Sequence, residues 1–179
     1  IAVDDVDPSR TNVLRLYSDT NCEDHNTDGG VDGYCTLYGP EVWSEPFDAT
    51  LGQSVSFDWR ATGASDDYEI YAFLVAVDET SPSVFDYGDD DAHTLLAYGR
   101  GDSQGWTTAS SVVPAAGSYR FRFVNGSYDG SGGLALGSEM FIDSVVKVGL
   151  TNPITFPQPG DKIVGAAPFA LSPTSPAGP

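Results

Sequence analysis

The sequence predicts an all-β domain, an antiparallel β-sandwich or jelly roll with long acidic loops. Helix signals are nearly absent, because the chain holds 20 Gly and 12 Pro and no stretch repeats apolar residues at helical spacing over three turns. Apolar and polar residues instead alternate over short segments separated by Gly, Pro, Asn or Asp. With 40% hydrophobic residues in a chain of 179, a substantial core can form.

The expected elements are about eight short strands, a number typical of a sandwich or jelly roll. In chain order they are Asn12–Tyr17, Tyr34–Tyr38, Gln53–Arg60, Tyr68–Val77, Thr94–Tyr98, Trp106–Val113, Tyr119–Asn125 and Glu139–Val148.

Three of these segments indicate which faces are buried. In Gln53–Arg60 every second residue from Val55 to Trp59 is apolar, which predicts a strand with one buried face. Tyr119–Asn125 repeats this alternation, with its aromatic residues inward and its arginines outward. Tyr68–Val77 is apolar on both faces beyond its second residue, as expected of a central strand covered on both sides.

Four polar loops are expected between the strands, at Asp19–Gly33, Ala61–Asp67, Asp86–His93 and Asn125–Gly133. Loops carried by a rigid sandwich are the usual place for recognition. The composition changes after Gly149, since residues 151–179 hold seven prolines and few acids. We therefore expect one domain over residues 1–150 and, over 151–179, a linker with the start of a truncated β module. A single domain with an ordered Pro-rich tail is the alternative.

The charge of the chain excludes some partners. Eight Lys and Arg against 26 Asp and Glu give a net charge of −18, which repels phosphate backbones and anionic lipid headgroups. No Lys or Arg lies between Arg15 and Arg60, a stretch rich in acidic residues. Such density is tolerated where salt screens it or a cation neutralises it. A solvated surface suited to salty water and divalent metal bound in acidic loops both remain open.

Cys22 and Cys35 are the only cysteines, and turn-forming residues separate them. In an oxidising compartment a disulfide between them would close a loop worth about 3 kcal/mol. Two cysteines alone are too few for a zinc site, and acidic neighbours blunt thiol reactivity. No apolar run reaches the ~18 residues of a spanning helix, and no signal peptide is visible at Ile1. We expect a disulfide in a soluble piece of an exported protein.

Five blocks of sequence carry a resemblance to a known module. They are Ser56–Trp59, Asp67–Val75, Pro114–Phe121, Asn125–Gly133 and Phe141–Val145, of which Gly126–Gly133 is the most specific. Over residues 51–148 the chain resembles a ligand-binding β-sandwich of very large bacterial RTX-type surface adhesins, distantly similar to eukaryotic MAM adhesion domains. Residues 154–171 resemble the opening of the Ig-like repeats that follow such modules. The Cys22–Cys35 excursion and the run Asp89–Asp91 depart from the family pattern.

This resemblance implies an extracellular region at the bacterial cell surface. In some members a calcium-held pocket binds peptides or sugars, so the partner expected here is a peptide or glycan on another cell surface. The chain would act as a monomeric domain within a long fibre.

Calcium binds six to eight oxygen atoms, which Asp and Asn residues in loops supply. Asp28 and Asp32 lie with other such residues in the first acidic loop, where metal binding and simple solvation both remain open. Asp66, Asp67 and Asp129 form a second candidate set of metal ligands. They converge if Tyr68–Val77 and Tyr119–Asn125 share one sheet, and the side-chain carbonyl of Asn125 would then complete the shell.

Asp143 lies in a predicted strand beside apolar neighbours. A buried charge must be paired or coordinated, so a calcium ion at the edge of the sheet is one possibility. Exposure on the polar face of the strand is the other.

Aromatic side chains near the loops could stack on sugar rings or peptide side chains. The candidates are Tyr34, Tyr38, Trp43, Tyr87, Tyr98, Trp106 and Tyr128. Tyr128, in the Gly-rich loop, is expected to be the exposed one. The predicted ligand site is accordingly Asp67, Asn125, Tyr128 and Asp129, and the rival site is the disulfide-tied loop Asp19–Cys35.

Catalysis fits poorly, because the sequence has no nucleophile elbow and no zinc-protease helix motif. The leading hypothesis is a calcium-dependent peptide-binding or carbohydrate-binding domain of a secreted adhesin, not an enzyme. A calcium-stiffened spacer of a surface fibre and a carbohydrate-binding module of a secreted hydrolase are the alternatives.

Overall fold

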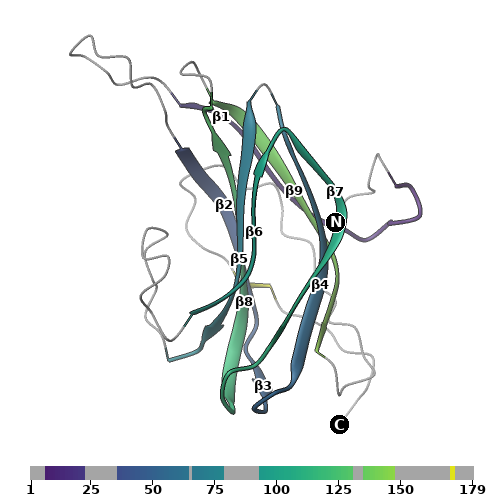
Figure 1. Ribbon diagram of the computed structural model, residues 1–179, viewed down its shortest axis with the longest axis vertical. Helices are drawn as coiled ribbons and strands as arrows, with labels where there is room; N and C mark the ends of the chain where they lie inside the picture. The colour runs from purple at the N-terminus through teal and green to yellow at the C-terminus, as the bar shows by residue number, and fades with distance from the viewer. Residues whose placement is uncertain are drawn as a thin grey trace, which may run out of the picture.

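The computed structural model describes residues 7–22, 36–64, 66–78, 93–130, 135–147 and 170–171. These residues form two β-sheets that pack face to face, and no helix is found among them (Figure 1). The predicted all-β sandwich is confirmed. No helix long and apolar enough to cross a membrane occurs in the described part of the chain.

The described strands number ten. They are β1 (Leu14–Cys22), β2 (Thr36–Ser44), β3 (Phe47–Ala49), β4 (Ser54–Gly63), β5 (Asp67–Ala76), β6 (His93–Gly101), β7 (Ser103–Val112), β8 (Gly117–Tyr128), β9 (Ala135–Lys147) and β10 (Ala170–Leu171). One sheet has the order β1-β9-β4-β7. The other has the order β10-β2-β8-β5-β6, with β3 also paired to β8. All neighbours are antiparallel except β10 and β2.

Each of the eight predicted segments overlaps a described strand, but three predicted loops begin too early in the sequence. β1 continues to Cys22, β4 continues to Gly63, and β8 continues to Tyr128 instead of giving way to a loop at Asn125. The polar end of β8 stays in the sheet because its backbone is paired on both sides. Tyr128 lies opposite Thr36 on β2 and opposite Asp67 on β5.

The core lies between the two sheets and follows the predicted alternation. Phe57 of β4 and Phe123 of β8 meet edge to face with their ring centroids 5.0 Å apart. Both side chains are fully buried, and burial of each contributes about 1.5–3 kcal/mol to folding. β5 is buried on both faces along most of its length, as predicted for a central strand.

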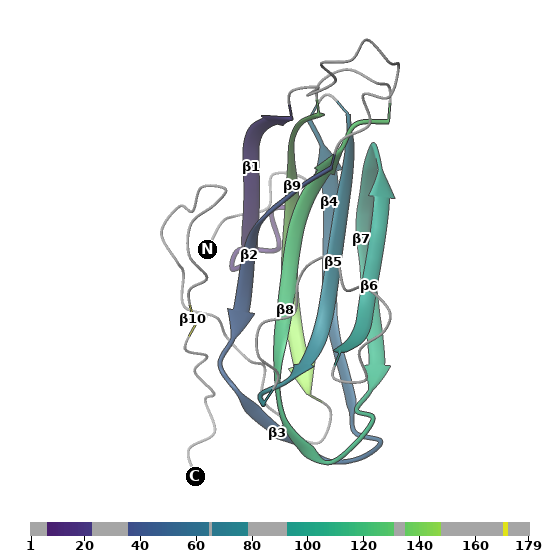
Figure 2. The ribbon, with the colours of Figure 1, turned by 90° about the vertical axis from the view of Figure 1, so that its left-hand side faces the viewer.

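Residues 151–179 lie outside the described residues except for β10. Ala170 and Leu171 pair in parallel with Trp43 and Ser44 of β2 (Figure 2). These two residues of the predicted second unit therefore pair with the six-stranded sheet.

Candidate functional site

The candidate site lies at the end of the sandwich where β8 ends and β5 begins, uppermost in Figure 1. β5 and β8 are antiparallel neighbours in one sheet, with Asp67 opposite Tyr128. The segments before β5 and after β8 therefore emerge at the same end. The topological condition for bringing Asp66, Asp67 and Asp129 near one another is confirmed.

Asp66 and Asp67 both line the backbone at Gly130. Oδ1 of Asp66 accepts hydrogen bonds from the backbone N–H of Asp67 at 3.0 Å and of Gly130 at 3.3 Å. A Cβ atom added to Gly130 would lie 3.5 Å from Oδ2 of Asp67 and 3.6 Å from Oδ1 of Asp66. Both distances are ordinary van der Waals separations, so Gly130 lies directly beside the two carboxylates.

Asp102 joins these carboxylates from the turn between β6 and β7. Its carboxyl group lies close enough to that of Asp67 to affect the ionisation of Asp67. Partial burial, this contact and the charge of Asp66 together raise the pKa of Asp67. Two carboxylates this close repel each other unless a proton or a cation lies between them. No sequence signal singled out Asp102, since nothing in its neighbourhood resembles a metal-binding motif.

The inner face at this end is polar, although it lies between the two sheets. Asn125 of β8 is completely buried, and its side-chain N–H donates to the carbonyl oxygen of Ser138 on β9 at 3.1 Å. Within the described ranges, no hydrogen-bond partner is found for Oδ1 of Asn125 or for Oγ of Ser127 and Ser138, all of which are buried. Asp129, also completely buried, continues the alternate positions of Asn125 and Ser127.

Tyr128 is half-buried instead of standing free in a loop. The guanidinium carbon of Arg100 lies 3.7 Å from the centroid of its ring, a cation–π arrangement. The prediction that Tyr128 is exposed in a loop was therefore wrong. Tyr128 belongs to a paired strand, and an arginine from β6 covers its ring.

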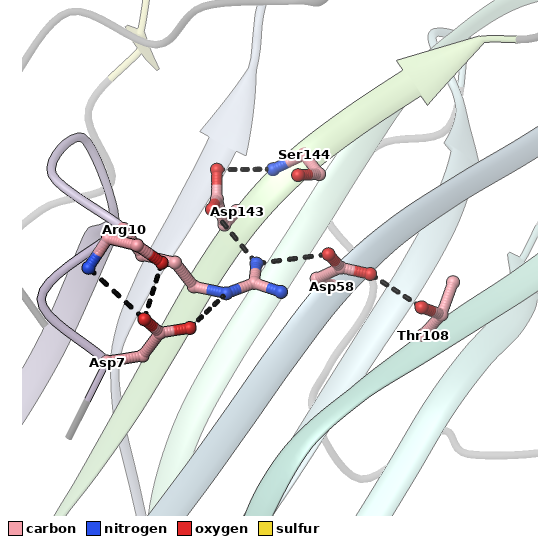
Figure 3. Close-up of polar contacts among 7 residues, drawn as sticks. Asp7, Arg10, Asp58, Thr108, Asp143 and Ser144 are labelled. Carbon is pink, nitrogen blue, oxygen red and sulfur yellow. Dashed lines mark hydrogen bonds and ion pairs between the residues drawn. The ribbon is translucent and has the colours of Figure 1, made fainter.

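Asp143 lies far from this end, on the outward face of the four-stranded sheet. Its Oδ2 accepts a hydrogen bond from Nη1 of Arg10 at 3.0 Å, and the same Nη1 donates to Asp58 at 3.0 Å (Figure 3). Calcium at the edge of the sheet was one of two possibilities for Asp143, and in the structure this carboxylate forms an ion pair with Arg10.

Asp28, Asp32 and Cys35 lie outside the described residues, as does the side chain of Cys22. Elsewhere, no three His, Cys, Asp or Glu residues in the described ranges are placed to hold a metal ion. The neutral oxygens of Asn125, Ser127 and Ser138 and the carboxylate of Asp129 are buried at this end of the sandwich.

The sequence analysis did not identify Ser127 and Ser138 as candidate site residues. Ser127 could have been found, because it occupies the alternate position between Asn125 and Asp129 on one strand. Ser138 could not, because only the packing of β9 against β8 brings it to the same place. Comparison with known proteins matches the chain to no family model and to no curated relative.

Proposed function

We propose that this chain is a calcium-dependent ligand-binding domain of a secreted bacterial surface adhesin, and not an enzyme. The observation that best supports the proposal is the group of buried oxygens without partners at Asn125, Ser127 and Ser138. They lie at the end of the sandwich where Asp66 and Asp67 converge on Gly130.

Each buried polar atom left without a partner costs about 1–3 kcal/mol. Calcium bound by Asp129 and by the nearest of these oxygens would remove part of that cost, since carboxylate, amide and hydroxyl oxygens are hard ligands. An ordered water could also satisfy the three neutral groups. A cation would in addition bind the carboxylate of Asp129, which is completely buried.

Bound at this position, calcium would join β8 to β9 and fix the start of the segment that follows Tyr128. Asp66, Asp67 and Asp102 lie at the rim of the same end. The ligand would be an extracellular peptide or glycan on another cell surface, bound by one copy of the domain.

A Cys22–Cys35 disulfide would stabilise the first acidic loop, and intact-mass measurement after alkylation tests it. Two alkylated thiols without reductant would exclude the bond.

The proposal is tested by calcium titration calorimetry together with glycan and peptide arrays, run with calcium and with chelator at fixed ionic strength. We expect calcium at 100 times its Kd to stabilise the fold by about 2.7 kcal/mol. We also expect chelator to abolish ligand binding. Asp129→Asn should weaken both effects, whereas Asp78→Asn, an exposed residue just after β5, should change neither.

The results of these experiments distinguish the ligand-binding domain from the spacer of a surface fibre. Calcium binding with no ligand on either array would favour the spacer of a surface fibre. A melting temperature that does not respond to chelator would contradict the proposal.

A further inference from the structure

The outward face of the six-stranded sheet is turned toward the viewer in Figure 2. On this face, several tyrosines surround a buried carboxylate. We call it the tyrosine platform. It consists of Tyr38 on β2, Glu69 and Tyr71 on β5, Tyr98 and Arg100 on β6, and Tyr128 on β8.

Glu69 is the centre of the platform and is only 1% exposed. Its Oε1 accepts hydrogen bonds from the hydroxyls of Tyr71 and Tyr98, both at 3.2 Å, and from Nη2 of Arg100 at 2.5 Å. The hydroxyl of Tyr38 donates to Oε2 at 3.4 Å. These contacts compensate for burying the charge, and they fix the hydroxyl ends of three tyrosines in one place.

The rings of the platform contact one another as well. The centroid of Tyr71 lies 4.9 Å from that of Tyr98 and 5.8 Å from that of Tyr38. Arg100 lies over Tyr128, the residue that leads into the candidate site at Gly130. The platform is thus continuous with the end of the sandwich where the carboxylates gather.

Two ion pairs lie on this face of the sheet. Glu69 is paired with Arg100, and Glu41 is paired with Arg122, whose Nε and Nη2 donate to one carboxylate oxygen at 3.0 and 2.6 Å. The charges of both pairs cancel, although the chain as a whole carries −18. An anionic ligand would be repelled by the surrounding charge, and a cationic one would meet neutralised carboxylates.

Tyr98 is the accessible part of the platform. It is 47% exposed and lies on β6, at the end of the sheet among the described strands. Its hydroxyl is held by Glu69, so its ring is fixed while much of it remains open to solvent. A rigid aromatic with few rotatable bonds binds a ligand with little loss of entropy.

We propose that the tyrosine platform binds a neutral saccharide, with one hexopyranose ring stacked on Tyr98 and its hydroxyls hydrogen-bonded to Arg100. A pyranose ring offers an apolar face for the tyrosine and hydroxyl oxygens for the guanidinium, and it carries no charge. Glu69 is a positioning residue, because it orients Tyr98 and Arg100 without itself being accessible. This inference rests on the proposed function, since it names the ligand class of that binding domain.

The test is an array that carries neutral hexose oligosaccharides, sialylated glycans and peptides, followed by calorimetry with the neutral oligosaccharides that bind. Tyr98→Ala should weaken binding at least tenfold. Tyr17→Ala is the matched control, because Tyr17 is 46% exposed on β1 of the other sheet, an exposure close to that of Tyr98. That variant should bind like the unmodified protein.

Glu69→Gln should weaken binding, whereas Glu139→Gln, a change on the outward face of the other sheet, should not. Calcium-dependent melting, measured on every variant, should be the same for Tyr98→Ala as for the unmodified protein. The platform assignment is overturned if Tyr98→Ala binds normally, or if only peptides or sialylated glycans bind. Peptide binding that requires calcium would overturn the platform while leaving the proposed function intact. If neutral saccharides bind through Tyr98 without any dependence on calcium, the proposed calcium-dependent function is overturned and the platform assignment stands.

Discussion

Asp58 on β4 lies directly opposite Asp143 on β9, and both carboxylates accept a hydrogen bond from the same nitrogen of Arg10 (Figure 3). Like charges that face each other across a strand pair destabilise a sheet. Here the guanidinium removes that repulsion and also lies 4.1 Å from the ring centroid of Trp106 on β7. The segment before β1 thereby fastens three strands of the four-stranded sheet.

Replacement of Arg10 should therefore destabilise the fold. We expect Arg10→Ala to lower the free energy of unfolding by about 1–2 kcal/mol, because two partly buried carboxylates would then face each other unpaired. Arg15→Ala is the control, since its side chain is 43% exposed against 24% for Arg10 and pairs with a single acid, Glu139. Urea unfolding measures both variants.

A second change distinguishes repulsion from simple loss of packing. Adding Asp58→Asn to Arg10→Ala removes one of the two facing charges. The double variant should recover part of the lost stability. If it is less stable than Arg10→Ala alone, then packing against Trp106 and not charge accounts for the effect.

Gly126 is required where β8 passes between its two neighbours. A Cβ atom at this position would lie 2.6 Å from the carbonyl oxygen of Glu69 and 2.7 Å from that of Leu37. Both obstacles are backbone atoms of paired strands, so neither can move cheaply. Gly126→Ala should cost about 1–3 kcal/mol or more in unfolding experiments. Gly105→Ala, where nothing lies within 4 Å, should cost far less, and equal costs would contradict this explanation.

The contact between Asp67 and Asp102 predicts a specific pH dependence. The pKa of Asp67 is raised in the folded state, so the folded protein binds this proton more tightly than the unfolded chain does. The stabilising contribution is fully present below the unfolded pKa of 3.8 and is lost as pH rises through the raised folded value. At neutral pH the ionised group therefore weakens the fold.

Asp67→Asn should accordingly raise the melting temperature at pH 7 in chelator, by about 1–3 °C for a like-charge pair near the surface. The gain should shrink as the pH falls toward 4, where the native carboxyl group also becomes neutral. Asp102→Asn should behave in the same way, and the double variant should gain less than the two single gains added together. A gain independent of pH would exclude electrostatic repulsion as the cause.

The strands could be predicted from the sequence because alternation depends only on neighbouring residues. The prediction that the side chain of Arg122 points outward was also correct, but the burial of that side chain was not predictable. It is buried because Glu41 and Trp43 of β2 lie beside it, and the sequence does not say that β2 is the neighbour of β8. The pairing of Asp143 with Arg10 was hidden for the same reason, since 133 residues separate them.

The candidate site was predictable in part. The convergence of Asp66 and Asp67 on the segment after β8 followed from a single assumption about which strands share a sheet. The inner oxygens required knowledge of how the sheets pack, because Ser138 meets Asn125 across the interior. The sequence analysis selected acidic residues as candidate metal ligands, because their charge suggests metal binding. It did not select the neutral serine hydroxyls, because serine is common in any exposed loop or strand.

The neutral donors provide the most discriminating prediction about calcium. Ser127→Ala and Ser138→Ala each remove a buried hydroxyl that has no partner within the described protein. Without calcium these changes should be neutral or slightly stabilising, because no hydrogen bond is lost. With calcium each should weaken the ion's affinity about tenfold, equivalent to about 1.4 kcal/mol of the calcium-dependent stabilisation.

Ser44→Ala is the matched control for these two variants. Ser44 is equally buried, but its hydroxyl accepts the backbone N–H of Phe121 at 2.9 Å and donates to the carbonyl oxygen of Glu45 at 2.9 Å. Its loss should cost about 1 kcal/mol to the same extent with calcium and with chelator. If the Ser127 and Ser138 variants retain the full response of the melting temperature to calcium, the ion is not bound between β8 and β9. The buried oxygens would then be hydrated, and any calcium would have to bind elsewhere on the chain.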